Sequence, residues 1–378
     1  MENPKISARL KTSDEFVYRH IGNSEVSTSK ALKVLGVDSV DQLMNEIVPE
    51  DIRLPPGMMF KHNGKELKGI DSETLMLERM RQLADANVLN KNFIGQGYYG
   101  TNTPSVIRRN VLENPKWYTP YTPYQAEIAQ GRLESLLNFQ TAIMGLTNMA
   151  IANASLLDEA TSAAEAVQMS YNIHNGKREK YFLSESTFPQ NIDVIKTKCH
   201  ALNIELVIGD VAKFDWSKAS EYCGMLVQNP DNFGNLHDYT ELGSVLRQND
   251  IVFTICADIL SLTLAKPPGD MNADIAVGSA QRMGIPLAFG GPHPGFFATT
   301  DKLKRKMPGR VIGISKDVHG NQAFRMAMQT REQHIRRDKA TSNICTAQAL
   351  LANMSAFYMQ WHGRSGLRKI AKKTRFMA

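Results

Sequence analysis

An aspartate that directly follows an apolar run is the first candidate for chemistry in this sequence. Asp258 ends the stretch from Phe253 to Ala257, which has the composition of a buried strand. Parallel sheets place ligands at the carboxyl ends of their strands. An enzyme that uses pyridoxal phosphate needs a carboxylate there to keep the pyridine nitrogen protonated. The alternative is an aspartate that only caps the next turn, and the residue taken alone favours that simpler interpretation.

A second group that this cofactor needs is missing. The lysine that binds it covalently is expected after the next strand, roughly 20–30 residues beyond Asp258. That region, 274–283, contains Arg282 and no lysine. Arginine stays protonated near neutral pH and cannot form the imine, and Lys266 precedes the strand beside two prolines. These residues argue against an independent pyridoxal-phosphate enzyme.

Small hydroxylated residues precede a predicted helix at 155–165. Ser155 and Thr161 belong to this segment, and the free N–H groups of a helix start can hold a phosphate. Asp158 and Glu159 put negative charge at the same place. A helix start stabilised by its own acidic residues is therefore favoured over an anion site.

A loop rich in glycine and proline surrounds one histidine. His293 lies within residues 289–297, a segment that either approaches a ligand closely or makes a tight turn. No second histidine, cysteine or carboxylate lies at ligand spacing, so we predict no metal site there.

Irregular segments with aromatic and charged residues are the remaining candidates. Tyr98, Tyr99 and residues 121–125 gather aromatic and amide groups, and a binding site or an oligomer interface explains them equally well. Residues 330–339 carry four cations and two acids. They run into the uncharged segment 340–345, a pattern typical of a loop held against an anion or a partner.

Composition excludes several classes of protein. The chain has 378 residues, with Lys+Arg 44 against Asp+Glu 38 and a net charge of +6. It is 42% hydrophobic and 22% charged, which is ordinary for a globular protein, and no apolar run approaches the roughly 18 residues of a membrane helix. No nucleic-acid-binding motif accompanies the small positive charge. Four scattered cysteines favour buried, reduced thiols over a disulfide framework or a redox-sensitive site: Cys199, Cys223, Cys256 and Cys345.

Two kinds of pattern divide the chain. Capping residues predict helix starts at Ser13 and Ser39, and Pro55 is expected to end the second of these helices. Helical patterns at 72–87 and 126–146 dominate up to about residue 150, whereas short β-branched or aromatic runs alternate with helices from about 155 onward. The last clear helix is predicted at 346–361. The short runs are 181–183, 205–208, 224–227, 251–255 and 274–277. This alternation predicts a mainly parallel sheet that is covered on both faces. We divide the chain into an N-terminal helical segment (1–57), a helical arm with an aromatic loop region (58–150), an α/β large domain (151–345) and the start of a C-terminal segment (346–378).

Longer stretches of the sequence resemble the glycine cleavage system P-protein. The similar stretches are 95–99, 121–127, 130–140, 153–159, 278–282, 290–293 and 330–351. The resemblance extends from residue 16 to residue 363 and concerns the amino-terminal half of that family. Such a chain is either the first half of a fused enzyme or the separate subunit 1 of a two-chain form.

The resemblance implies an aspartate-aminotransferase-like fold (pyridoxal-phosphate fold type I), preceded by a helical N-terminal segment and followed by a truncated C-terminal small domain. It also implies the activity of glycine dehydrogenase (decarboxylating), in which glycine loses CO2 with the help of pyridoxal phosphate and the aminomethyl group passes to lipoylated H-protein. The family's cofactor lysine belongs to the carboxyl-terminal half, and Arg282 takes the equivalent position here. The resemblance thus implies a degenerate cofactor pocket built from Ser155, Thr161, Asp258, Gln281, Arg282 and His293.

By this resemblance the chain alone is inactive and serves as scaffold and active-site wall. The residues that we expect to reach across to the partner's site are Tyr98, Tyr99, Tyr124, Gln125, Arg331 and His334. The implied partners are the carboxyl-terminal half (or subunit 2), the lipoylated H-protein and glycine, with neither nucleic acid nor membrane among them. The alternative is a non-catalytic pseudoenzyme that binds the catalytic half or the H-protein and no cofactor.

Two features depart from the family pattern. Its first half continues past residue 362 into a small domain, whereas this sequence stops within the helix predicted at 369–378. We therefore expect a fragment with an unburied apolar face and low stability alone. Residues 1–11 show no clear transit peptide, and we expect the mitochondrial matrix for a eukaryotic protein and the cytoplasm for a bacterial one.

Overall fold

The computed structural model describes residues 20, 22–53, 61–66, 69–70, 72–119, 121–288, 290–291, 293–329, 333–344 and 347–378, and not the side chains of His62 and His334. The chain divides into two compact units, Met1–Lys91 and Asn92–Ala378. The predicted helix start at Ser13 and the predicted stop at Pro55 lie outside the described residues.

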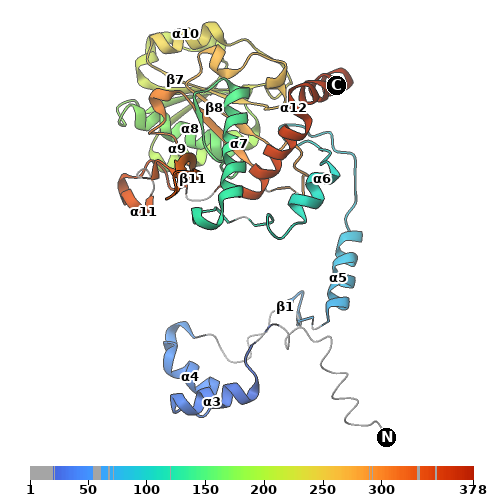
Figure 1. Cartoon of the computed structure of the whole chain (residues 1–378). Helices are drawn as coiled ribbons and strands as arrows, with labels where there is room; N and C mark the ends of the chain where they lie inside the picture. The colour runs from blue at the N-terminus through green and yellow to red at the C-terminus, as the bar shows by residue number, and fades with distance from the viewer. Residues whose placement is uncertain are drawn as a thin grey trace. The chain divides into compact units, whose positions relative to one another are not determined.

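In its described residues, the first unit has short helices and one small hairpin (Figure 1). Its elements are α3 (Glu25–Leu35), α4 (Val40–Ile47), η1 (Glu50–Ile52), the antiparallel pair β1 (Lys61–His62) and β2 (Lys65–Glu66), and α5 (Glu73–Asp85). Ser24, Ser39 and Ser72 cap the three α-helices, because each hydroxyl accepts a hydrogen bond from a backbone N–H of the first turn. The predicted helix start at Ser39 is thereby confirmed. None of these helices buries a residue, so capping and not a core defines them.

A seven-stranded sheet forms the centre of the second unit. Its strands, in spatial order, are β3 (Ile151–Ala152), β9 (Gly295–Thr299), β8 (Ile275–Ser279), β7 (Val252–Ala257), β6 (Tyr222–Asn229), β4 (Lys180–Ser184) and β5 (Glu205–Gly209). The five strands from β8 to β5 are parallel, whereas β9 is antiparallel to both of its neighbours. The predicted parallel sheet is confirmed, and the five runs found in the sequence fall on its five parallel strands.

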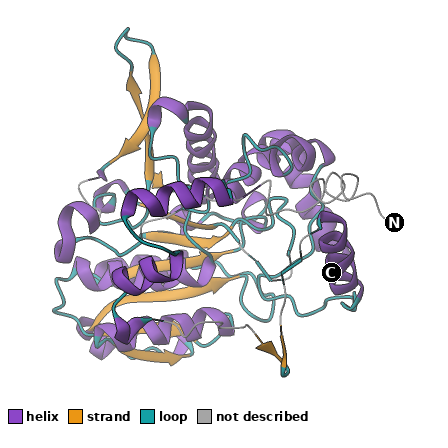
Figure 2. Ribbon diagram, turned by 90° about the horizontal axis from the view of Figure 1, so that it is seen from below, coloured by secondary structure: helices purple, strands orange, loops and turns teal. Residues whose placement is uncertain are grey.

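Helices cover both faces of this sheet (Figure 2). They are α7 (Gln130–Thr147), α8 (Glu159–Ile173), α9 (Pro189–Leu202), α10 (Thr240–Gln248) and α12 (Ala349–Met377). Val277 and Phe297 pack into the core under α8 and α9, whereas their neighbours Ala276 and Phe296 pack under α7 and α12. Because successive strand residues point to opposite faces, a sheet that is buried on both sides needs apolar residues at nearly every strand position.

Several elements differ from the sequence-based expectation. Residues 295–297, which we predicted as part of the loop at 289–297, belong to β9, and a hairpin of β10 (Val311–Lys316) and β11 (Gln322–Ala327) was not predicted at all. The hairpin stands away from the sheet (Figure 2), with Val318 at its tip 95% exposed. The predicted helices at 346–361 and 369–378 both fall on α12, which is kinked at Gly363, where φ is 58° and ψ is −179°.

Short helical segments connect these elements. They are α6 (Ser105–Ile107), η2 (Arg108–Leu112, a π-helix), η3 (Ala126–Ile128), η4 (Val211–Lys213), η5 (Trp216–Glu221), η6 (Ser261–Thr263), η7 (Pro268–Met271), η8 (Asp301–Leu303), α11 (Gln333–Arg336) and η10 (Arg337–Lys339). Among the described residues, no helix has both the length and the apolar character that a bilayer crossing requires.

Candidate functional site

The carboxyl end of β7 carries an ion pair where a cofactor's pyridine nitrogen would be expected. Asp258 follows β7, and its Oδ2 accepts a hydrogen bond from Arg282 Nη1 at 3.0 Å. Its Oδ1 accepts from the Ser261 N–H at 2.8 Å, so it also caps the next turn, as the simpler interpretation predicts. The Arg282 guanidinium lies 4.3 Å from the ring centroid of Tyr99. The carboxylate is thus neutralised by this chain's own arginine.

Gln281 holds the backbone around this pair in place. Its Nε2 donates to the Tyr99 carbonyl at 2.8 Å and to the Ile285 carbonyl at 2.7 Å. The side chain is fully buried. Gln281 therefore fixes Tyr99, and with it the stacked Arg282, and acts in the architecture of the site.

The head of α8 is stabilised by its own acidic residues. Asp158 is the N-cap, and its Oδ1 accepts from the Thr161 N–H at 2.7 Å. Ser155 precedes it with a left-handed φ of 109° and accepts a hydrogen bond from the Gln348 N–H, not from the head of α8. The predicted self-stabilised helix start is therefore confirmed.

Glu159 turns its carboxylate toward three other elements of the sheet edge. Its Oε1 accepts from Asn191 Nδ2 at 2.7 Å, in the first turn of α9, and from Gln228 Nε2 of β6 at 3.5 Å. Its Oε2 accepts from the Ser279 N–H, at the end of β8, at 3.1 Å. Burial raises the pKa of the Glu159 carboxyl above its ordinary value, and hydrogen bonds from its neighbours oppose that effect. The Glu159 carboxylate thus accepts all three of these hydrogen bonds at the N-terminus of α8.

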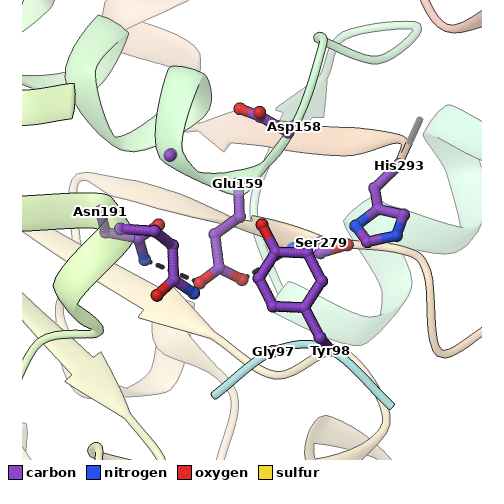
Figure 3. Close-up of a pocket in the computed structure, with 9 residues that line it drawn as sticks. Gly97, Tyr98, Asp158, Glu159, Asn191, Ser279 and His293 are labelled. Atoms are coloured by element: carbon purple, nitrogen blue, oxygen red, sulfur yellow. Dashed lines mark hydrogen bonds between the residues drawn. The ribbon is translucent and has the colours of Figure 1, made fainter. Parts of the chain in front are cut away.

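A small pocket opens beside Glu159 (Figure 3). Tyr98 and His293 form one side of it with their ring centroids 5.1 Å apart, and Asp158, Glu159 and Asn191 form the other. Burial lowers the pKa of His293, which keeps its imidazole neutral near neutral pH. The cavity measures about 20 Å³, and a single water molecule needs about 10–15 Å³.

Pyridoxal phosphate does not fit this arrangement. The helix N-terminus that would receive its phosphate already carries Asp158 and Glu159, and two carboxylates repel a dianion. Asp258 is paired with Arg282, and no lysine lines the pocket. The cavity is also too small for a pyridine ring.

The predicted wall residues fall into two groups. Tyr98 and Tyr99 lie at the pocket and at Arg282. Tyr124 packs against Arg310, which donates through Nη2 to its hydroxyl at 3.2 Å and lies 5.1 Å from its ring centroid. Gln125 precedes the turn η3. The tyrosines therefore line different parts of the unit.

Two predicted residues lie outside what the structure describes, and other functional candidates were missed. Arg331 and the side chain of His334 are not among the described residues. Asn191, Gln228 and Arg310, all nearly or fully buried, were not predicted from the sequence. A polar residue at the end of an apolar run was the only signal for Gln228.

The fold defines the class of the protein. A mainly parallel sheet with helices on both faces and an aspartate at the end of β7 is the large domain of pyridoxal-phosphate fold type I. Residues 18–378 match the family described as "Glycine cleavage system P-protein". The chain belongs to that family.

Curated relatives carry the name glycine dehydrogenase (decarboxylating). The protein of Photobacterium profundum is 51% identical over 364 residues, which are 96% of this chain and 37% of the relative. That of Nostoc sp. is 51% identical over 369 residues, 98% of this chain and 37% of the relative. The mitochondrial protein of Pisum sativum is 50% identical over 369 residues, 98% of this chain and 34% of the relative. The chain thus spans little more than a third of these relatives' length.

Solved structures agree with the assignment of fold and family. A glycine decarboxylase (P-protein) of the glycine cleavage system in inhibitor-bound form has a TM-score of 0.83 and 34% identity, covering 93% of this chain and 78% of that one. A sphingosine-1-phosphate lyase of Burkholderia pseudomallei shares the fold alone, with a TM-score of 0.54 and 10% identity over 84% of this chain and 74% of the lyase.

Proposed function

We propose that this chain is the amino-terminal half, or subunit 1, of a glycine dehydrogenase (decarboxylating) of the glycine cleavage system. The complete enzyme would decarboxylate glycine with pyridoxal phosphate and transfer the aminomethyl group to lipoylated H-protein. The cofactor lysine would belong to the carboxyl-terminal half, and the four-part division of the chain made from its sequence is part of this proposal. The extent of the match, 96% of this chain against 37% of the relative from P. profundum, supports such a half.

The observation that carries the proposal is the ion pair of Asp258 and Arg282. A working cofactor pocket of this fold needs a free carboxylate for the pyridine nitrogen and a lysine for the covalent bond. Here the carboxylate binds Arg282 at 3.0 Å, and an arginine cannot form the imine. We infer that this half keeps the fold as a scaffold and leaves the chemistry to its partner.

The proposed contribution of this half to the reaction is a wall beside the partner's active site. Tyr98 and Tyr124 are each 36% exposed, so both present an aromatic face and a hydroxyl that a neighbouring subunit can contact. Gln125, Arg331 and His334 belong to the same proposal as members of the family's motifs. The lipoylated H-protein would dock on this side of the complex.

Two measurements test the proposal. Borohydride reduction with pyridoxal phosphate, followed by peptide mass spectrometry, should label no lysine of this chain. Mixing the chain with a carboxyl-terminal half should give glycine-dependent CO2 exchange, which Tyr98→Phe or Tyr124→Phe weakens. Tyr118→Phe is the matched control, because Tyr118 is 52% exposed outside both groups.

A labelled lysine in this chain would refute the scaffold proposal. Exchange that is unchanged in Tyr98→Phe and Tyr124→Phe would refute the wall. Binding of the other half without any exchange would instead favour a pseudoenzyme that only assembles with its partner.

A further inference from the structure

The pocket at the head of α8 has the opposite electrostatic character from a cofactor cradle. Asp158 and Glu159 contribute carboxylates to it, and no lysine or arginine is among the described residues that line it. Arg282, which belongs to the neighbouring ion pair, is bound to Asp258 and stacked on Tyr99. A site of this kind attracts a cation and repels an anion.

Two buried polar atoms at the pocket lack a partner among the described residues. Asn191 Oδ1 has none, although the side chain is fully buried and its Nδ2 donates to Glu159. His293 Nε2 has none either, and the residue is only 6% exposed. Buried polar atoms in folded proteins are nearly always hydrogen-bonded. Each of these two atoms can therefore still form a hydrogen bond with a bound group.

Asn191 Oδ1 is a hydrogen-bond acceptor, and His293 Nε2 is one when the imidazole carries its proton on Nδ1. The amide orientation of Asn191 follows from its partner, since only Nδ2 can donate to the Glu159 carboxylate. A neutral imidazole with its proton on Nδ1 presents Nε2 as an acceptor, and burial, which lowers the pKa of His293, favours the neutral form. A group with N–H or O–H donors therefore satisfies Asn191 Oδ1, and it also satisfies His293 Nε2 in this tautomer.

The size of the cavity limits what can supply them. Its volume of about 20 Å³ suits an ion close to water in size. Tyr98, which also lines the cavity, is 36% exposed, so the pocket reaches the surface there. Among the described residues, no three His, Cys, Asp or Glu side chains are grouped as a metal ion would require. A small protonated amine meets all three requirements, because it carries a positive charge, has N–H donors and is small enough for the cavity.

We propose that this pocket binds a small ammonium ion, ammonium itself or methylammonium, with N–H donors on Asn191 Oδ1 and His293 Nε2 and with Glu159 and Asp158 as the counter-charges (Figure 3). Because its residues come from α8, α9 and the loops at 97–98 and 293, the ion joins four segments. This binding site is independent of the proposed role of the chain as half of a larger enzyme.

Calorimetric titration of the purified protein with ammonium and methylammonium chloride tests the site. Potassium chloride and tetramethylammonium chloride at equal ionic strength are the comparison ions, since neither can donate a hydrogen bond. We expect saturable binding of the first two ions only. Glu159→Gln and His293→Phe should each weaken the binding at least about tenfold, which corresponds to one charge-assisted hydrogen bond.

The matched control is Glu205→Gln, the same change at a side chain that is 60% exposed beside Lys180 on the edge strand β5. It should leave the binding of ammonium unchanged. If Glu159→Gln does not fold, His293→Phe and the comparison of ions on the unaltered protein still decide the question. Equal binding of potassium, no saturable binding of ammonium, or unchanged affinity in folded variants would each overturn the proposal.

Discussion

Single side chains at the carboxyl edge of the sheet determine its charge balance. Asp258 and Arg282 are 15% and 16% exposed and 3.0 Å apart, so each is largely removed from water and depends on the other. Arg282 also stacks on Tyr99 at 4.3 Å, and Gln281 fixes the backbone of that tyrosine. The pair is therefore part of a packed network, unlike the exposed ion pairs elsewhere on the chain.

Loss of the arginine should destabilise the protein measurably. Arg282→Met leaves the Asp258 carboxylate without its counter-ion, and we expect the free energy of unfolding to fall by about 1–3 kcal/mol. Urea denaturation measures this change. Lys266→Met is the matched control, because Lys266 and Asp238 are 41% and 63% exposed, and its effect should stay within about 0.5 kcal/mol. Equal effects of the two substitutions would contradict the argument.

The sequence pointed to Asp258 and Arg282 as members of one pocket, but it predicted neither their ion pair nor the surroundings of Glu159. Asp258 and Arg282 each follow a recognisable strand, and strand ends of a parallel sheet meet at one edge. Asn191, Gln228 and Ser279 come from α9, β6 and β8, and no sequence spacing tells which of their polar groups faces Glu159. Their convergence depends on the strand order, which local patterns do not contain.

At the scale of elements, the approach of β9 to α8 shapes the pocket. Gly295 begins β9, and a Cβ there would overlap the backbone carbonyl of Asp158. Gly295 also exchanges backbone hydrogen bonds with Leu156, at 2.8 and 3.0 Å. The helix cap and the strand start can therefore lie together only because residue 295 has no side chain.

Replacement of Gly295 and of Gly131 by alanine should change the free energy of unfolding in opposite directions. Gly295→Ala forces the cap of α8 away from β9, and we expect it to lower the free energy of unfolding by about 1–3 kcal/mol. Gly131→Ala, in the first turn of α7 with open space around the new methyl group, should raise it by up to about 1 kcal/mol. Thermal unfolding of both variants measures these changes. If Gly295→Ala leaves the stability unchanged, the close approach of β9 to the cap of α8 is not rigid.

Strand β9 and the hairpin of β10 and β11 were not predicted from the sequence, for two different physical reasons. Four of the five parallel strands, β4, β6, β7 and β8, are buried along their whole length or nearly so, and produce continuous apolar runs. The edge strand β5 has exposed and half-buried positions only. β9 is also fully buried, but its short run directly follows a segment crowded with glycine and proline, which reads as a turn. β11 has exposed as well as buried positions. Its hairpin with β10 is a separate sheet and does not share the continuous apolar runs of the seven-stranded sheet. Burial on two faces leaves a clear signal in the sequence only where no glycine- and proline-rich segment adjoins the strand, and a projecting hairpin leaves none.

At the scale of the whole molecule, apolar exposure is concentrated in the first unit. Along α5 the exposed apolar side chains are Leu75, Met76, Leu77, Met80 and Leu83. A helix with this composition is typical of a surface that another chain or domain covers. The relatives from P. profundum and Nostoc are covered to only 37% of their length by this chain, so much of a relative's length is available to provide such a cover.

Hydrogen exchange should separate the two units of the chain sharply. Helices α3, α4 and α5 bury no residue, whereas every residue of β6 is buried, and amides without tertiary packing open with little free-energy cost. By mass spectrometry, we expect peptides of α5 to exchange orders of magnitude faster than those of β6, with α7 as a helical control that has seven buried residues. Adding the carboxyl-terminal half should slow α5 and leave β6 unchanged. Protection of α5 equal to that of α7 in the chain alone would show that its apolar side chains already have a partner.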